Sequence, residues 1–165
     1  MSEVLNDVQS DQWEQLVVFR LASEFYGVDI SAVNTIIRMQ EITEIPQTPT
    51  FVEGVINLRG SIIPVIDLRK RFGLPVGETT KSSRIVVVEG AGQLIGMVVD
   101  AVAETLRLSS DAIEPPSPVI ASVDAEYLRG VGKQENRLVI LLDLDRVLTS
   151  REVDTLTRME KAKAA

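Results

Sequence analysis

The sequence contains no cysteine and no histidine among its 165 residues. The first absence excludes disulfides and thiol nucleophiles, and the second excludes every acid–base scheme that depends on an imidazole. Together they remove the side chains on which zinc and haem sites ordinarily depend. We therefore expect no metal site and no cofactor.

Long apolar runs are also missing, because none approaches the roughly 20 residues that a membrane-spanning helix needs. Residues 1–13 are polar and acidic, and they lack the basic stretch followed by an apolar stretch that marks a signal peptide. We expect these residues to form a flexible N-terminus. The protein is predicted to be cytoplasmic, with no segment inserted in a membrane.

Positive charge is in deficit, with 17 Lys and Arg against 24 Asp and Glu and a net charge of −7. Nucleic acids and anionic membranes both bind clustered Lys and Arg. The charge balance therefore disfavours both as main partners. The apolar fraction of 45% is ordinary for a globular domain, and the composition as a whole favours a binding protein over an enzyme.

The stretch 54–73 organises the rest of the chain. It holds two apolar runs, 55–58 and 62–66, separated by Arg-Gly-Ser. Apolar runs of this length bounded by turn residues are typical of buried strands joined by a tight hairpin. Gly60 stands where a short hairpin loop needs a residue with positive φ. Arg59 is the lone charge at the predicted tip.

A capped helical turn follows this hairpin. The side chain of Asp67 is predicted to cap a helix over 68–72, and Gly73 to end it in a left-handed conformation. Elsewhere, apolar runs predict strands at 15–21, 25–30, 42–45, 84–89, 94–99, 105–108, 127–131 and 137–142.

Further helical turns are predicted over 50–53, 100–104 and 109–113. Thr48 provides the cap for the first of these, with a proline directly after it. Residues 31–37 fit either a helical turn or the start of a strand. A capping box at 149–152 opens a final helix, so that 151–165 is predicted to be a C-terminal helix and tail.

The chain repeats itself. Residues 16–38 align without gaps with 85–107, and residues 54–72 align with 130–148. The aligned pairs include Gly27 with Gly96, Val33 with Val102, and Asp67 with Asp143. Each half therefore predicts the same order of strands, proline-containing loop, hairpin and capped turn.

Several short strands in each half suit a small closed barrel, because closure removes exposed sheet edges. One such barrel has little core of its own, and two packed together share more apolar interior. We therefore predict a mainly β protein of two tandem five-stranded SH3-like barrels with a shared core and a groove between them. The first barrel is placed at 14–82 and the second at 83–150.

The motifs of this chain resemble those of the CheW family of chemotaxis coupling proteins. The matching segments are Tyr26-Gly-Val-Asp-Ile, the run from Pro49 to Arg69 with its Asn-Leu-Arg-Gly, Ile95-Gly-Met-Val-Val-Asp-Ala-Val, Glu126-Tyr-Leu-Arg-Gly-Val-Gly, and Val139-Ile-Leu-Leu-Asp-Leu-Asp. The resemblance covers about residues 14–150 and is highly specific. Members of the family are twin five-stranded barrels, in agreement with the repeat.

The resemblance implies a non-enzymatic adaptor of bacterial chemotaxis. Proteins of this family link the cytoplasmic hairpin tip of chemoreceptors to the regulatory domain of the histidine kinase CheA, itself a CheW-like domain. Such domains alternate in rings within receptor arrays. Other CheW-like domains are thus further expected partners, and the arrays are expected to recruit the protein to the membrane. A coupling protein for pilus motility or gene regulation fits the same residues.

The resemblance also carries over partner-binding positions. Arg59 matches the arginine of the family's Asn-Leu-Arg-Gly motif, which is implicated in coupling. The other matching positions, associated with kinase or receptor binding, are Gly54, Asn57, Gly60, Val33, Gly96 and Val102. Thr35 stands where the family often has a glutamate that can pair with the motif arginine. Arg59 must then either pair with another acid, of which the candidates are Glu41, Glu44 and Glu53, or be free to meet a partner.

Structural roles remain open for several of these residues. The glycines can serve turns or close packing, Val33 and Val102 can belong to the core, and Asp67 and Asp143 recur as helix caps.

An enzymatic alternative would use Asp29 and Asp100 as paired carboxylates, or Ser61 as a nucleophile. No base, nucleophile pair or metal-ligand cluster accompanies these residues in the sequence. We therefore expect no catalytic residue.

Overall fold

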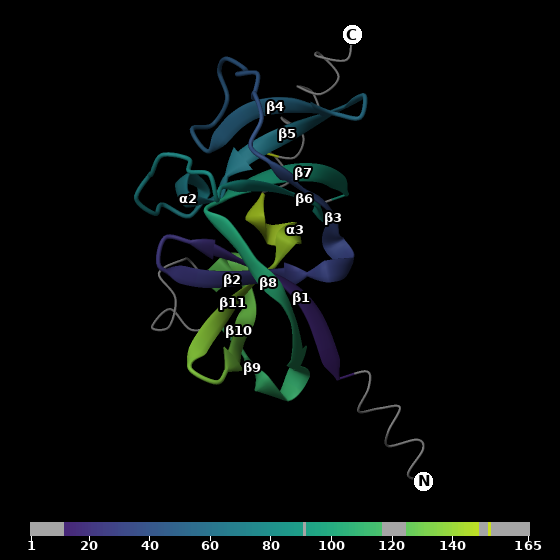
Figure 1. Ribbon diagram of the computed structural model, residues 1–165, viewed down its shortest axis with the longest axis vertical. Coiled ribbons are helices and arrows are strands. Elements are labelled where there is room, and N and C mark those ends of the chain that lie inside the picture. Colours follow the sequence, from purple (N-terminus) through teal and green to yellow (C-terminus); the bar gives the residue numbers. More distant parts are fainter. Residues whose placement is uncertain (1–11, 91, 117–124, 149–151, 153–165) are drawn as a thin grey trace.

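The computed structural model describes residues 12–90, 92–116, 125–148 and 152, which form two β-sheets stacked along the longest axis (Figure 1). Within these ranges, no helix is long and apolar enough to cross a membrane. The predicted flexible N-terminus (1–13) and C-terminal helix and tail (151–165) lie almost entirely outside the described residues.

The sheet at the top of Figure 1, here called the upper sheet, has five strands. In spatial order they are β3 (Val33–Arg38), β6 (Arg84–Gly90), β7 (Gln93–Val99), β5 (Ser61–Asp67) and β4 (Val52–Leu58). The lower sheet has six, in the order β8 (Ala101–Ser109), β1 (Trp13–Leu21), β2 (Glu24–Asp29), β11 (Arg137–Leu142), β10 (Leu128–Gln134) and β9 (Ile113–Glu114). Short helical turns join them: η1 (Ile30–Ala32), α2 (Leu68–Arg71), η2 (Ser110–Ala112), η3 (Ala125–Tyr127) and α3 (Leu144–Val147).

Each sheet combines strands from both halves of the chain. The lower sheet places the β1–β2 hairpin between β8 and the β10–β11 hairpin. The upper sheet does the reverse, with the β6–β7 hairpin between β3 and the β4–β5 hairpin. Two parallel pairings, β2 with β11 and β5 with β7, join a hairpin of one half to a hairpin of the other. The halves therefore repeat one topology and interlock.

This arrangement confirms the mainly β class and corrects the predicted domain division. Segments 14–82 and 83–150 do not form one barrel each, because each sheet takes strands from both segments. The similarity between the halves revealed the repeat but not which hairpin pairs with which. A repeated hairpin can pair with its own half or with the other, and the sequence pattern is the same in both cases.

The largest cluster of buried apolar side chains draws on both sheets. It includes Phe19 and Tyr26 of the lower sheet and Met97 of the upper sheet. Figure 1 shows α3 between the two sheets, and Val147 of α3 belongs to the same cluster. Each sheet adds a smaller cluster of its own. The predicted shared core is thus the main interior of the molecule.

Aromatic rings make one row through this shared core. The ring centroids of Phe19 and Tyr26 lie 6.1 Å apart, as do those of Tyr26 and Phe72. The centroid of Phe72 lies 5.4 Å from that of Tyr127. Aromatic pairs at these separations add to the stabilisation from burial alone. The row connects β1 and β2 with the end of α2 and with η3.

Arg71 ties the chain beyond α3 to this aromatic row. Its guanidinium carbon lies 4.6 Å from the ring centroid of Phe51 and 5.1 Å from that of Tyr127. Its Nε donates to the carbonyl of Val147 at 2.6 Å, and its two Nη atoms donate to the carboxylate of Glu152 at 3.0 and 2.9 Å. Bidentate pairs and desolvated cation–π contacts are among the stronger polar interactions.

A second polar tie joins the sheets through Asp100, which follows β7. Both its carboxylate oxygens accept hydrogen bonds from Arg69 of α2, and Oδ2 also accepts one from the N–H of Ala22 at 2.8 Å. Burial opposes the ionisation of Asp100, but the hydrogen bonds from Arg69 and Ala22 outweigh it and lower its pKa below the usual 3.8. The carboxylate thus connects α2 with the turn between β1 and β2.

Several local predictions are confirmed. Asp67 accepts a hydrogen bond from the N–H of Arg69 at 2.9 Å, and Asp143 accepts one from the N–H of Asp145 at 3.1 Å, so both aspartates cap helical turns. Gly73 has a φ of +71° just after α2. Residues 31–37 contain both of the alternatives, since η1 leads directly into β3.

Three local predictions are wrong, at 42–45, 50–53 and 100–104. The first segment makes only an isolated bridge, between Thr43 and Val55. Thr48 does not cap a helix, because its hydroxyl donates to a preceding carbonyl and the chain enters β4 instead. The third segment begins β8, because antiparallel pairing with β1 overrides its local preference for a turn.

Asp100→Asn is expected to lower the free energy of unfolding by about 1–3 kcal/mol at neutral pH, because it removes the charge from a paired, partly buried carboxylate. Chemical denaturation of the two proteins measures this difference. Asp111→Asn changes an exposed carboxylate and serves as the control, with an expected change of less than about 0.5 kcal/mol.

The same pair of proteins gives a pH test. A lowered pKa in the native state stabilises the protein above the unfolded-state value of 3.8, and this stabilisation disappears as the pH falls through the native pKa. The difference between wild type and Asp100→Asn should therefore shrink on acidification below 3.8. A difference that persists or grows in acid would contradict the role of the ion pair.

Candidate partner-binding surface

The tip between β4 and β5 is a two-residue loop. Leu58 pairs with Ser61, so that Arg59 and Gly60 alone lie between them. Their φ angles are +53° and +90°, as the type I′ turn favoured in two-residue hairpins requires. The side-chain oxygen of Asn57 accepts a hydrogen bond from the N–H of Gly60 at 2.8 Å. Asn57 and Gly60 therefore fix the shape of the loop.

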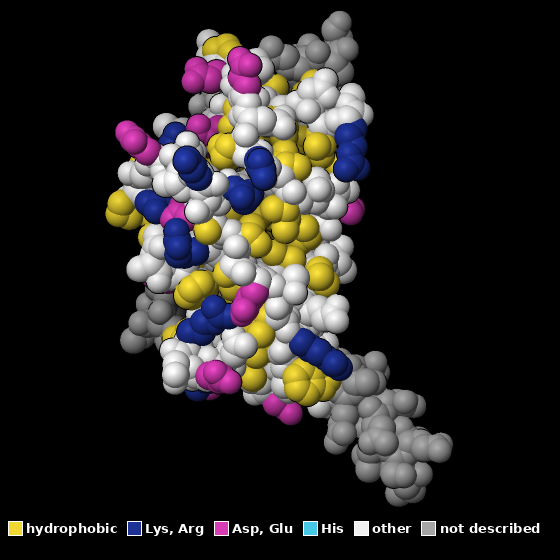
Figure 2. All heavy atoms as spheres, in the orientation of Figure 1, with side chains coloured by type: hydrophobic (Ala, Val, Ile, Leu, Met, Phe, Trp, Pro, Cys, Tyr) yellow, Lys and Arg dark blue, Asp and Glu magenta, His cyan; other side chains and the backbone are white. Residues whose placement is uncertain are grey.

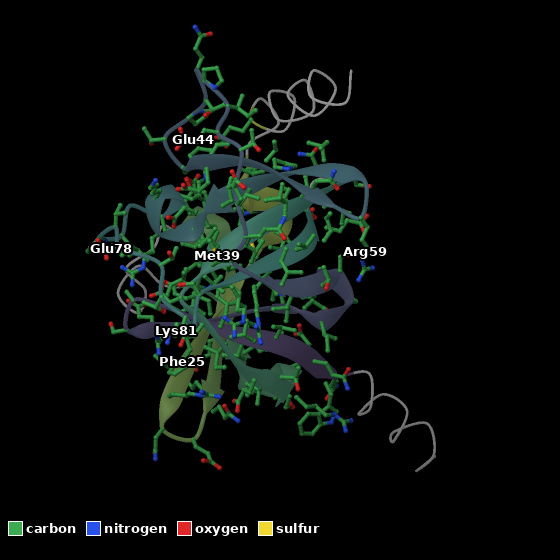
Figure 3. The ribbon with its side chains drawn as sticks, turned by 45° about the horizontal axis from the view of Figure 1, so that its top comes forward. Phe25, Met39, Glu44, Arg59, Glu78 and Lys81 are labelled. Atoms are coloured by element: carbon green, nitrogen blue, oxygen red, sulfur yellow. The ribbon has the colours of Figure 1, made fainter. Side chains whose placement is uncertain are left out.

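Arg59 points away from the molecule at this tip (Figure 3). The residue is exposed, and its guanidinium has no ion pair or hydrogen bond within the described part of the chain. Within the described residues, no other acid therefore takes the place of the glutamate that is absent at Thr35. Glu53, one of the acids considered, pairs instead with Lys70, Nζ to Oε1 at 2.7 Å, and this hydrogen bond raises the pKa of Lys70. The guanidinium is thus available to a partner.

The equivalent tip between β10 and β11 is also a two-residue loop and carries the opposite charge. Gln134 pairs with Arg137 across a loop of Glu135 and Asn136, and Glu135 has a φ of +45°. The two-residue length of the loop therefore belongs to the repeated fold. The arginine belongs to the first copy alone.

Gly54 has a structural role in β4. Its φ is +144°, and a Cβ atom at this position would lie 2.1 Å from the carbonyl oxygen of Thr43. This close approach allows Thr43 and Val55 to exchange two backbone hydrogen bonds of 2.9 Å each. Only glycine fits this site, so its occurrence is explained without a partner.

Gly96 also serves packing, at the parallel joint between β5 and β7. It is paired with Val65, and an added Cβ would lie 2.9 Å from Cγ2 of Ile85. Its counterpart Gly27 is paired with Leu141 at the other parallel joint, between β2 and β11. Both glycines are buried and allow the two halves to approach closely.

Val33 and Val102 lie on the edge strands β3 and β8 of the two sheets. Both are partly buried and pack against the shared core cluster. Figure 2 shows hydrophobic side chains gathered in the middle of the visible face, at the level where the two sheets meet. Thr35 is also partly buried on β3, where it is paired with Val87 of β6.

The eight candidate residues therefore separate into three groups. Asn57, Arg59 and Gly60 form the tip of the β4–β5 hairpin. Val33, Thr35 and Val102 lie on the edge strands, two of them against the shared core. Gly54 and Gly96 are internal packing positions. The first two groups can contact a partner. The glycines of the third group allow close packing of the strands in the upper sheet.

An exposed aromatic contact at the start of β1 escaped the sequence analysis. Trp13 is 46% exposed, and the guanidinium carbon of Arg107 lies 5.0 Å from its ring centroid. Ile30 is another large exposed apolar residue. The only trace in the sequence was the single tryptophan, because its arginine partner depends on the pairing of β1 with β8.

The residues considered for catalysis have structural roles. Asp29 caps η1 by accepting from the N–H of Ser31 at 2.9 Å, and Asp100 is held by Arg69. Ser61 is an exposed residue at the start of β5. Across the described residues, no group of three or more Asp or Glu side chains could hold a metal ion. In the described part of the chain, Asp29, Asp100 and Ser61 do not bring a nucleophile together with a base.

The chain is similar to known proteins over most of its length. The model of the CheW-like domain family matches residues 15–152. The "Chemotaxis protein CheW" of Treponema pallidum is 34% identical over 154 residues, which cover 91% of each chain. The protein of the same name from Klebsiella aerogenes is 36% identical over 150 residues and 90% of each chain.

A solved structure agrees with these similarities. The crystal structure of the scaffolding protein TtCheW from Thermoanaerobacter tengcongensis is 44% identical in sequence and superposes with a TM-score of 0.78. The match covers 84% of this chain and 90% of that chain.

Gly54→Ala is expected to lower the free energy of unfolding by more than about 2 kcal/mol, because it combines an unfavourable φ with a clash against backbone. Gly73→Ala is the control, since its φ is also positive but no atom lies within 4 Å of the added Cβ. Its expected cost is about 1 kcal/mol. Equal costs for the two variants in denaturant unfolding would show that the contact with Thr43 is unimportant.

Proposed function

The chain belongs to the family of CheW-like domains, and from this premise we propose that it couples chemoreceptors to the histidine kinase CheA. The proposed role is that of a scaffold in chemotaxis and not of an enzyme, because the relatives are named as chemotaxis proteins and TtCheW is named as a scaffolding protein. The proposed partners are the cytoplasmic hairpin tip of a chemoreceptor and the regulatory domain of CheA.

The observation that carries this proposal is that Arg59 is exposed and forms no ion pair in the described part of the chain. A cation at a rigid tip, exposed and without an ion pair in the described part of the chain, is set up to bind a carboxylate of another protein. Asn57 and the two-residue loop hold the backbone of the tip in place, so little order is lost when the side chain engages. We assign the contact with the kinase to this tip.

The apolar surface where the sheets meet suits the receptor. Val33 and Val102 contribute partly exposed apolar area there, next to the shared core. An amphipathic helical hairpin binds such a surface through residues repeated every three or four positions. The receptor and the kinase would then contact different parts of the molecule and could bind together.

Array formation would follow from repeated contacts of this kind. Individual scaffold interfaces can be small and weak, and several linked contacts raise the overall affinity far above that of each. Other CheW-like domains would be neighbours in such rings. The protein would therefore be cytoplasmic and be recruited to membrane-associated receptor arrays by its partners.

Calorimetric titration against a receptor hairpin fragment and against the regulatory domain of CheA tests the proposal. We expect saturable binding to each fragment. No detectable binding to either would overturn the coupling role.

Arg59→Ala is expected to weaken binding of the CheA regulatory domain by about tenfold, because an exposed cation contributes to the contact. The melting temperature should change by less than about 2 °C, since no intramolecular contact is lost. Glu135→Ala, at the equivalent tip of the second copy, is the matched control and should leave kinase binding unchanged. A large loss of melting temperature with intact binding would instead assign Arg59 to the fold.

A further inference from the structure

A surface pocket at the edge of the upper sheet concentrates positive charge. Its volume is about 430 Å³, and it is lined by Arg38, Met39, Thr80, Lys81, Ser83 and Arg84. Three of these residues are cationic and none is acidic, in a chain whose net charge is −7. We call it the Arg38–Arg84 pocket. None of its residues belongs to the candidate set discussed above.

Two of its cations face each other across neighbouring strands. Arg38 of β3 is paired directly with Arg84 of β6. Directly opposed residues have Cβ atoms about 5 Å apart, and like charges in such pairs are destabilising. Neither arginine forms an ion pair within the described ranges, nor does Lys81. The fold therefore holds an unfavourable charge pair that a bound anion would relieve.

The loop that carries Lys81 is ordered by its own hydrogen bonds. The N–H of Thr80 donates to the hydroxyl of Ser83 at 2.8 Å, and the N–H of Ser82 donates to the hydroxyl of Thr80 at 3.1 Å. Nη1 of Arg84 donates to the carbonyls of Lys81 and Ser83, at 2.8 Å each. These bonds hold Nη1 of Arg84, and its other N–H groups have no partner in the described part of the chain.

Met39 is the apolar residue among those that line the pocket. It packs against the buried cluster of the upper sheet. Figure 3 shows Met39 near the centre of the visible face, with Lys81 below it. Dark blue side chains gather above the hydrophobic middle of the face in Figure 2. Cations around a thioether suit a side chain that has both methylene groups and a carboxylate.

We propose that the Arg38–Arg84 pocket binds an acidic segment of a protein partner, with a glutamate carboxylate seated between the two guanidinium groups. Guanidinium groups bind carboxylates through paired, charge-assisted hydrogen bonds. The glutamate methylenes would lie on Met39, and a second carboxylate would meet Lys81. A protein segment is favoured over nucleic acid because the net negative charge of the chain repels a long polyanion.

Fluorescence anisotropy with a labelled peptide of alternating Glu and Gly tests this on the full chain. We expect saturable binding at low ionic strength that weakens as salt rises to about 0.5 M. The variant Arg38→Ala/Arg84→Ala should weaken binding about tenfold or more. The variant removes the opposed like charges but also the two hydrogen bonds from Arg84 to its own loop, so its melting temperature should change by less than about 4 °C.

The matched control is Lys133→Ala/Arg146→Ala, which makes the same change in net charge on exposed residues of the lower sheet and α3. This control should bind the peptide within about twofold of wild type. Equal weakening by both double variants would reduce the effect to net charge and overturn the proposal. Absence of saturable binding at low salt would overturn it as well.

One further variant tests the pocket, and a competition experiment distinguishes between classes of ligand. Lys81→Ala alters only an exposed loop side chain and should also weaken peptide binding, which keeps the test decisive even if the double variant fails to fold.

Inorganic phosphate and a short single-stranded oligonucleotide serve as competitors of the acidic peptide. Stronger binding of either one than of the acidic peptide would contradict the assignment to a protein segment. Because the assay contains no receptor or kinase fragment, its outcome is separate from that of the coupling role.

Discussion

The parallel pairings of β2 with β11 and of β5 with β7 are the contacts on which the rest of the structure depends. Each joins a hairpin of one half of the chain to a hairpin of the other. A glycine lies at each joint, Gly27 and Gly96, because a larger side chain would press on the valines, isoleucine or leucine of the neighbouring strands. Neither sheet is complete without both halves, and the buried side chains of both sheets pack together in the shared core. The protein is thus one interlocked unit.

Interlocking also decides which residues are available to partners. It places β3 and β8 at the edges of their sheets, where Val33 and Val102 contact the shared core and remain partly exposed. It leaves the tips of the β4–β5 and β10–β11 hairpins outside the core. The fold then supplies two hairpins that each end in a two-residue loop, and sequence differences give one loop Arg59 and the other Glu135. A repeated scaffold with unequal surfaces suits a protein that holds different partners.

Local chemistry was predictable from the sequence, and long-range pairing was not. The hairpin at Arg59 and Gly60, with the caps at Asp67 and Asp143, follows from turn and capping preferences that act within a few residues. Segment 100–104 was misassigned because β8 is a strand only through its pairing with β1. The family motifs located Gly54 and Gly96, but their packing roles needed the positions of Thr43 and Ile85. The opposed Arg38 and Arg84 are far apart in the sequence, and only the β3–β6 register brings them together.

We propose that the hairpin tip and the apolar surface between the sheets bind different partners at the same time. Sedimentation velocity on a mixture of the chain, a receptor hairpin fragment and the CheA regulatory domain tests this directly. We expect a complex that contains all three components and sediments faster than either two-component complex. If the two fragments displace each other, so that only two-component complexes form at saturating concentrations, the claim of separate surfaces is wrong.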